Sequence, residues 1–281
     1  EAIFIFMNVA FNPGDHLIVH YPCYQSLFTV AKSVGCEVTK WQVREEENWE
    51  PDLGVLRRNI KKNTRAIIVN CPHNPTGFLL KKEKWQQLLD IAREYQLLVF
   101  SDEVYRFLEY SAGDRLPAAA DLYARGVSLG VMSKAFGLAG LRIGWVASRD
   151  RRLLKKMASF KDYTTICCSV TSEYLAAVAL RNREKILKRS LTIIQKNLLA
   201  LNQFFTDYPE VFNWLPPRAG PIAFPRLRSN QHAETFCREL LERKGVLLLP
   251  GSCFNGFPFN FRIGFGRQNL PRGISLIREY L

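Results

Sequence analysis

Five short runs of apolar and β-branched residues constrain the fold of this chain more than any other feature of its sequence. They cover residues 16–21, 65–70, 97–102, 127–132 and 143–147, and each run is almost uninterrupted. A strand that is apolar on both of its faces is typical of a sheet that is covered on both sides. We therefore expect these runs to form the buried strands of a central sheet.

Segments with helical periodicity separate the apolar runs. In two of these segments, apolar residues recur at spacings of three and four positions, which is the period of a helix that buries one face. They are Trp85, Leu88, Leu89 and Ala92 in the first segment and Leu153, Leu154, Met157 and Phe160 in the second. Alternation of strands and helices favours an α/β fold with a mostly parallel sheet sandwiched by helices.

The alternation stops near residue 171. Two helical stretches, 171–181 and 184–205, follow each other without a strand between them. Beyond several prolines come short strands at 222–224, 246–249 and 261–265, a helix at 232–244 and a last helix from Pro271. We therefore expect a large domain over residues 1–183 and a smaller C-terminal α/β domain over residues 184–281, bridged by the long helix.

The composition excludes several functional classes. Lys and Arg exceed Asp and Glu by 13, but the basic residues are spread along helical faces and form no cluster with a nucleic-acid-reading motif. No stretch reaches the roughly 18 apolar residues that a membrane helix needs. We therefore expect neither a nucleic-acid partner nor a membrane.

The seven cysteines show no C-x-x-C spacing, and their number is odd. This pattern indicates neither a disulfide framework nor a metal site. Reduced and mostly buried thiols are typical of a cytoplasmic protein, which is the location that we expect.

Two short motifs stand at the carboxyl ends of expected strands, where open α/β sheets bind ligands. One is Asn-Cys-Pro-His-Asn-Pro-Thr-Gly at 70–77, and the other is Ser-Asp-Glu-Val-Tyr at 101–105. Taken alone, the first is an ordinary turn sequence and the second is an acidic residue that leaves the core. Neither motif decides the function by itself.

The segment 133–145, Ser-Lys-Ala-Phe-Gly-Leu-Ala-Gly-Leu-Arg-Ile-Gly-Trp, carries the strongest signal. Lys134 follows the apolar run 127–132, and lysines are almost never buried without a function. A desolvated lysine is a natural nucleophile for a Schiff base. The glycines allow a ligand to approach the backbone, and the planar guanidinium of Arg142 suits a phosphate. An ordinary surface loop is the weaker alternative.

One further arginine, Arg262, lies among aromatic residues in Phe-Arg-Ile-Gly-Phe at 261–265. A buried arginine is normally paired with a carboxylate. Its partner is therefore either an internal Asp or Glu or the carboxylate of a substrate.

The order of these four segments resembles that of the class I/II aminotransferases, which belong to the fold-type I pyridoxal-phosphate superfamily. The resemblance runs from residue 1 to the C-terminus. It implies pyridoxal 5′-phosphate as the cofactor and transfer of an amino group between an α-amino acid and a 2-oxo acid. It also implies a homodimer with the site near the subunit interface.

The resemblance assigns catalytic roles to three residues. Lys134 would bind the cofactor as a Schiff base and then carry the proton between Cα of the substrate and C4′ of the cofactor. Asp102 would keep the pyridine nitrogen protonated, which makes the ring an electron sink. Tyr105, together with Asn74, would hydrogen-bond the 3-oxygen of the ring.

Further residues would hold the cofactor and the substrate. Tyr24 matches the aromatic residue that stacks on the ring, and Arg142 would bind the phosphate. Arg262 would bind the α-carboxylate of the substrate with the help of Asn74.

Two departures from the family pattern concern the phosphate. A phosphate-binding serine usually stands three residues before the lysine, where this chain has Val131, and Ser133 would compensate only in part. The Gly-Ala turn that cradles the phosphate ordinarily comes just before the Glu-Ala-Ile at which the sequence begins. We therefore expect the large domain to be incomplete at its N-terminus, in a fragment or a truncated gene product with weakened cofactor binding.

The substrate and the exact chemistry stay open at this point. Segment 163–170 lacks the arginine that aspartate-type members use for a side-chain carboxylate, which argues against dicarboxylic substrates. The stretch 161–167 resembles a branch that includes capreomycidine synthase, so cyclisation, or lyase or decarboxylase chemistry, is one alternative. A second alternative is the cofactor-binding effector domain of a MocR-type transcription regulator, and a third is an inactive remnant.

Overall fold

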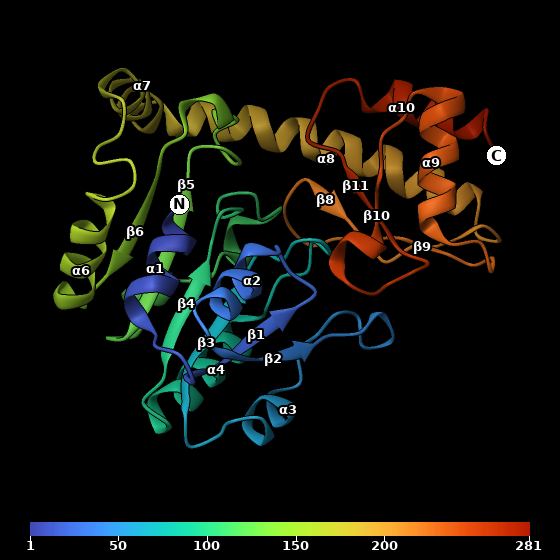
Figure 1. The fold of residues 1–281 in the computed structure, drawn as a ribbon. Coiled ribbons are helices and arrows are strands. Elements are labelled where there is room, and N and C mark those ends of the chain that lie inside the picture. The colour runs from blue at the N-terminus through green and yellow to red at the C-terminus, as the bar shows by residue number, and fades with distance from the viewer.

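A six-stranded sheet forms the centre of the N-terminal part of the molecule in the computed structural model, which describes residues 1–281 (Figure 1). Its strands are β1 (His16–Tyr21), β2 (Glu37–Gln42), β3 (Thr64–Asn70), β4 (Leu98–Asp102), β5 (Gly126–Val131) and β6 (Gly144–Ser148). Their order across the sheet is β2-β1-β3-β4-β5-β6. The pairings among β1 to β5 are parallel, and β6 is antiparallel to β5.

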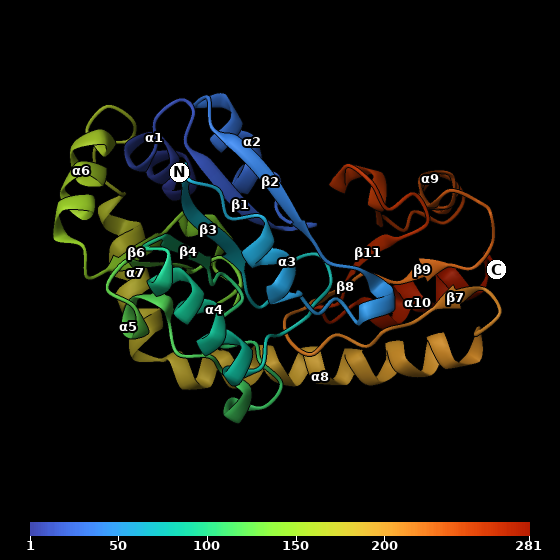
Figure 2. The same cartoon turned by 90° about the horizontal axis from the view of Figure 1, so that it is seen from below.

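Helices cover both faces of this sheet, as the alternating strand and helix pattern predicted (Figure 2). One face packs against α1 (Ala2–Ala10), α2 (Ser26–Ser33) and α6 (Arg151–Lys161). The other face packs against α3 (Leu53–Arg58), α4 (Lys82–Glu94) and α5 (Ala119–Leu122). Successive strand residues divide between the two cores: Leu17 and Val19 lie in the first, and Ile18 lies in the second. The α/β fold class with a mostly parallel sheet is therefore confirmed.

The two edge strands differ from the sequence prediction. The run 143–147 does form a strand, β6, but Gly144 and Trp145 are exposed and the strand is antiparallel. The connection 132–143 holds only a 3-10 helix, η3 (Ala139–Leu141), so the chain turns back instead of crossing over the sheet. At the opposite edge, β2 was missed because Trp41 is its only buried residue.

The C-terminal part is built on the long helix α8 (Arg183–Asp207), which follows α7 (Val170–Arg181). With 25 residues, α8 is about 37 Å long and runs from the large sheet to the C-terminal strands (Figures 1 and 2). Those strands are β7 (Phe212–Asn213), β8 (Ile222–Ala223), β9 (Arg226–Leu227), β10 (Leu249–Pro250) and β11 (Phe261–Gly264). They form a sheet of order β10-β11-β8 and a β7-β9 pair, covered by α9 (Ala233–Lys244) and α10 (Leu270–Arg278).

The remaining short helices are η1 (Glu45–Glu47), η2 (Ala112–Asp114) and η4 (Gly251–Phe254). No helix of the chain combines the length and the apolarity needed to cross a membrane. We propose residues 1–183 and 184–281 as the two domains, because every strand of the six-stranded sheet precedes α8.

Candidate functional site

The residues singled out in the sequence gather at one edge of the six-stranded sheet. Because β1, β3, β4 and β5 are parallel, their carboxyl ends meet there. Tyr24 follows β1, Asn74 follows β3, Asp102 ends β4 and Lys134 follows β5. Arg142 lies at the same edge, because the antiparallel β6 begins two residues after it. The chain switches direction across the sheet between β1 and β3, and such switch points bind ligands in open α/β sheets.

Lys134 is exposed at this edge, which corrects the expectation of a buried lysine. Its Nζ lies 5.7 Å from the centre of the Tyr105 ring and makes no hydrogen bond or ion pair within the protein. Partial desolvation and the positive charges of Arg262 and Arg142 lower the pKa of Lys134, against the opposing charge of Asp102. A lowered pKa leaves more of the amine unprotonated, which is the form that attacks a carbonyl.

Asp102 is a buried carboxyl group with one oxygen left free, and only 3% of the residue is exposed. Burial raises the pKa of Asp102 to about 7, and the neighbouring charge of Glu103 acts in the same direction. The Val104 N–H, which donates to Oδ1 at 3.2 Å, and the charge of Lys134 both oppose this rise. Oδ2 accepts no hydrogen bond from the protein, so it is available to an N–H donor of a ligand.

Arg262 reaches this edge from the C-terminal sheet. Its Nη1 donates to Oδ1 of Asn74 at 2.9 Å, and its guanidinium lies 5.9 Å from the centre of the Phe254 ring. Arg262 forms no ion pair with an Asp or Glu of the protein. Of the two partners that the sequence left open, the carboxylate of a substrate therefore remains. Burial raises the pKa of Tyr105 to about 12, which keeps its phenol protonated and able to donate.

The other expected cofactor ligands are less tightly fixed. Tyr24 is 52% exposed, and the half-buried Ser133 makes no hydrogen bond within the protein. Arg142 has a left-handed backbone with φ +54, and its Nη1 donates to the Ala139 carbonyl at 3.0 Å. A Cβ built on Gly140 meets no atom within 4 Å, so the loop between Lys134 and Arg142 borders open space.

Two buried polar residues to which the sequence analysis gave no role support the turn that carries Asn74. Asn70 ends β3, and its side chain bonds both Asp102 and Asn74. His73 donates from Nε2 to the Pro22 carbonyl at 2.6 Å, and its Nδ1 lies 2.7 Å from the Thr76 hydroxyl. A polar residue at the end of an apolar strand was the only available signal, and it does not reveal these partners.

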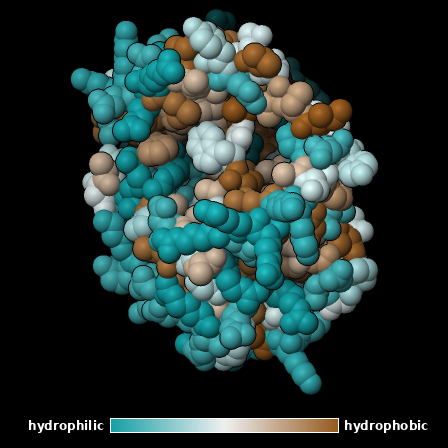
Figure 3. All heavy atoms as spheres, turned by 90° about the vertical axis from the view of Figure 1, so that its left-hand side faces the viewer, coloured by the Kyte–Doolittle hydropathy of each residue, from teal (hydrophilic) through white to brown (hydrophobic).

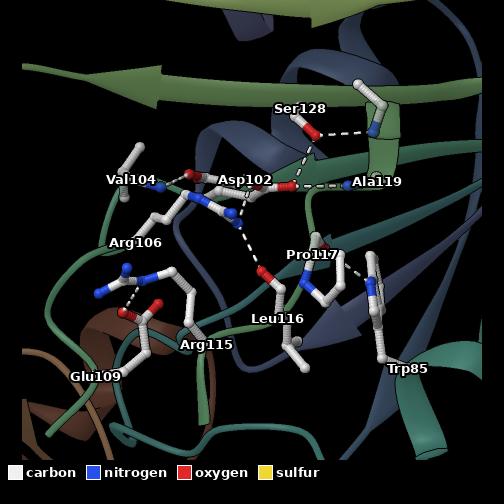
Figure 4. A network of polar contacts seen from close by, with 12 residues as sticks. Trp85, Asp102, Val104, Arg106, Glu109, Arg115, Leu116, Pro117, Ala119 and Ser128 are labelled. Carbon is white, nitrogen blue, oxygen red and sulfur yellow. Dashed lines mark hydrogen bonds and ion pairs between the residues drawn. The ribbon is translucent and has the colours of Figure 1, made fainter. Parts of the chain in front are cut away.

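A third buried residue, Glu103, fixes the end of β4 to the elements around it, and Figure 4 labels its partners Ser128, Ala119 and Arg106. Its Oε1 accepts from the Ser128 hydroxyl at 2.7 Å and from the Ala119 N–H at 3.1 Å. Its Oε2 accepts from Nη1 of Arg106 at 3.2 Å. Burial raises the pKa of Glu103, while these donors oppose the rise. Through Glu103, the residue that follows Asp102, this network links the end of β4 to β5 and α5.

The chemistry of these groups fits pyridoxal phosphate. An amine with a lowered pKa fits the carbonyl of the cofactor, and a free oxygen on a buried carboxyl group fits a pyridine N–H. A protonated phenol fits the ring 3-oxygen, and a guanidinium beside open space fits a phosphate.

Comparison with known proteins agrees with this fit. The family model for class I and II aminotransferases matches residues 1–273. Capreomycidine synthase of Streptomyces vinaceus is 33% identical over all of this chain and 72% of its own length. Glutamate-pyruvate aminotransferase of Escherichia coli is 28% identical over 97% of this chain and 69% of its own length.

Among solved structures, a pyridoxal-phosphate-dependent aminotransferase from Streptococcus suis superposes with a TM-score of 0.94 at 34% identity. The superposition covers all of this chain and 74% of that one. The chain belongs to the class I and II aminotransferase family, and it is a pyridoxal-phosphate-dependent enzyme that transfers an amino group between an α-amino acid and a 2-oxo acid.

Proposed function

We propose that Lys134 binds the cofactor in this enzyme, that Asp102 holds its ring nitrogen, and that Arg262 and Asn74 bind the α-carboxylate of the substrate. Bound pyridoxal phosphate supplies an electron sink for the bond that breaks at Cα of the amino acid. Lys134 then moves the proton at Cα, because its lowered pKa leaves more of the amine unprotonated and able to accept a proton. Tyr105 and Asn74 hydrogen-bond the 3-oxygen, and Tyr24, Ser133 and Arg142 complete the cofactor contacts.

One observation carries this assignment. Asp102 Oδ2, the Tyr105 hydroxyl and Lys134 Nζ have no hydrogen-bond partner in the protein, whereas the buried side chains of Asn70, His73 and Glu103 are paired. Polar groups without protein partners at the carboxyl ends of β4 and β5, with Lys134 Nζ 5.7 Å from the centre of the Tyr105 ring, support a polar ligand at this edge.

The substrate that we propose is an α-amino acid without a side-chain carboxylate. Segment 163–170 contains no arginine. The nearest basic candidate, Lys161, is already engaged, since its Nζ lies 3.2 Å from Oε1 of Glu1 and also bonds Thr165. A lysine held in this way is a poor receptor for a second carboxylate.

A second candidate function is cyclisation of an amino acid. It is favoured by the 33% identity to capreomycidine synthase. Analysis of the products separates the two reactions. Amino transfer needs a 2-oxo acid as acceptor and consumes it, whereas cyclisation proceeds without an acceptor and leaves the α-amino group on the product.

We also propose that the enzyme is a cytoplasmic homodimer. All seven cysteines are free thiols, which suits a reducing compartment. Apolar side chains are exposed between α6 and α7 and on α7, with exposures of 89% for Tyr163, 69% for Ile166, 79% for Val170 and 67% for Tyr174. Figure 3 faces this side of the molecule and shows apolar side chains between hydrophilic ones. Exposed apolar clusters of this kind are typical of protein contacts.

Titration of the visible absorbance of the cofactor-loaded protein tests the substrate assignment. We expect α-amino acids to change the absorbance and the matching amines without a carboxylate to leave it unchanged. Arg262→Lys should raise the dissociation constant of the amino acid roughly tenfold or more, because a lysine cannot reproduce the planar fork.

Arg226→Lys is the matched control, because Arg226 also lies over an aromatic ring, that of Phe259 at 5.7 Å, but pairs with Glu46 and not with Asn74. If both variants bound the amino acid like the wild type, Arg262 would not be the carboxylate receptor.

A further inference from the structure

Asn70 is placed between the two halves of the proposed site. It is the last residue of β3 and is 1% exposed. Its Nδ2 donates to the Asp102 carbonyl at 2.8 Å, and its Oδ1 accepts from the Asn74 N–H at 2.7 Å. One amide therefore connects the strand that carries Asp102 with the turn that carries Asn74.

The partners of Asn70 determine which way its amide points. The Asn74 N–H can only donate and the Asp102 carbonyl can only accept, so exchanging Oδ1 and Nδ2 would break both bonds. The Cys71 N–H also donates to the Asp102 carbonyl, at 3.1 Å. Two donors thus hold the peptide that follows Asp102, while the Val104 N–H holds Oδ1 of its carboxyl group.

The connection continues to the substrate side. Asn74 accepts from Arg262 through its Oδ1 at 2.9 Å, while its backbone N–H is bound to Asn70. Asp102, Asn70, Asn74 and Arg262 thus form an unbroken hydrogen-bonded chain from the cofactor side of the site to the carboxylate side. No other side chain bonds both Asp102 and Asn74.

We propose that Asn70 is a positioning residue, which fixes Asp102 and Asn74 relative to each other and so sets the separation between the cofactor and the carboxylate of the substrate. This inference rests on the proposed function of Asp102, Asn74 and Arg262. Small displacements of such groups matter, because a misplacement of about 1 Å can cost roughly 100-fold in rate.

The test uses Asn70→Leu in the full chain, with Asn197→Leu as the matched control. Asn197 is 2% exposed and donates from Nδ2 to the carbonyls of Phe265 and Arg267, both at 2.7 Å, in the C-terminal part. Each variant thus removes two hydrogen bonds of one buried amide. Three quantities are measured: the melting temperature, the pH midpoint of the visible absorbance of the loaded protein, and the dissociation constant of an α-amino acid.

We expect both variants to melt at lower temperature than the wild type. Asn70→Leu alone should shift the absorbance midpoint by about half a pH unit or more and raise the amino-acid dissociation constant roughly tenfold. If Asn70→Leu does not fold, Asn70→Ala and Asn197→Ala remove the same bonds without adding bulk and give the same comparison.

Two results would overturn the inference, and they are distinguishable. If Asn70→Leu lowered only the melting temperature, as the control does, Asn70 would be structural and the proposed function would stand. If the wild type itself took up no pyridoxal phosphate, the proposed function would fail, and this inference would fail with it.

Discussion

The side chain of Asp102 links the proposed contact with the cofactor to the stability of the fold. Burial raises its pKa from 3.8 to about 7, so the folded protein binds one more proton than the unfolded chain between these pH values. Stability from this group is therefore greatest at low pH and is lost as the pH rises through about 7. The total loss is roughly 4 kcal/mol. A ligand that carries a positive charge next to Asp102 would offset this cost.

We predict that Asp102→Asn stabilises the cofactor-free protein at pH 8, because the amide does not ionise and its oxygen can still accept from the Val104 N–H. The advantage over the wild type should shrink toward zero near pH 4. The same variant should lose several orders of magnitude in turnover, since it cannot hold the ring nitrogen protonated. Urea unfolding of both proteins across this pH range checks the first part, and a difference that did not vary with pH would contradict it.

His20 titrates in the opposite direction. Burial lowers its pKa to about 4, so the folded protein binds fewer protons than the unfolded chain between about 4 and 6.5. Its Nε2 has no hydrogen-bond partner, and its ring stacks on His73 at 4.1 Å. Stability from His20 is therefore lost as the pH falls below 6.5. His20 is present in both proteins, so its contribution cancels when the free energies of unfolding of Asp102→Asn and the wild type are subtracted. The difference therefore reports on Asp102 alone.

At the scale of the elements, Glu103 determines how firmly the end of β4 is held. It accepts hydrogen bonds from Ser128 on β5, from Ala119 at the start of α5 and from Arg106. We predict that Glu103→Ala lowers the free energy of unfolding by roughly 3–5 kcal/mol, because it leaves buried donors without an acceptor. Glu103→Gln keeps one oxygen acceptor and should cost less.

Arg115→Ala is a control for this comparison. It removes an ion pair of similar geometry, with Glu109 at 3.0 Å, that lies farther from Asp102 (Figure 4). Denaturant unfolding measures all three variants. Equal losses for Glu103→Ala and Glu103→Gln would show that the hydrogen bonds of Glu103 do not hold β4.

The elements themselves were largely predictable from the sequence. The helices expected at 171–181, 184–205 and 232–244 appear as α7, α8 and α9 with ends displaced by at most two residues. Apolar runs identified β1, β3, β4 and β5 because these strands are buried on both faces. The same criterion missed β2 and wrongly predicted that β6 is buried, because edge strands have few buried side chains. The direction of an edge strand depends on the connection that precedes it and not on its composition.

The candidate site was predictable only in its outline. Order and spacing of the motifs brought Asn74, Asp102 and Lys134 to one edge of the sheet, because carboxyl ends of parallel strands meet. The contacts of Asn70, His73 and Glu103 could not be foreseen. They join residues 32, 51 and 25 positions apart, and no local pattern encodes which carbonyl or hydroxyl a buried polar side chain will meet.

At the scale of the whole molecule, apolar side chains around α7 are exposed to solvent in the single chain. We predict that Val170→Asp, which places a charge at the start of α7 in the exposed apolar stretch that includes Ile166 and Tyr174, turns a dimer into a monomer. Leu199→Asp is the matched control, because Leu199 is 71% exposed on α8, where the residues at helical spacing, 195, 196, 202 and 203, are polar. Sedimentation velocity distinguishes the outcomes, and a Val170→Asp protein that stayed dimeric would exclude this face.

The central claim is that Lys134 carries the cofactor, and one measurement tests it directly. The protein is incubated with pyridoxal phosphate, reduced with borohydride, digested and mapped by mass spectrometry. Reduction converts a Schiff base into a stable secondary amine, so the mass of the cofactor stays on the lysine that held it. We predict the label on the peptide that contains Lys134 and its loss in Lys134→Ala. A label on another lysine, such as Lys161 or Lys40, would contradict the account.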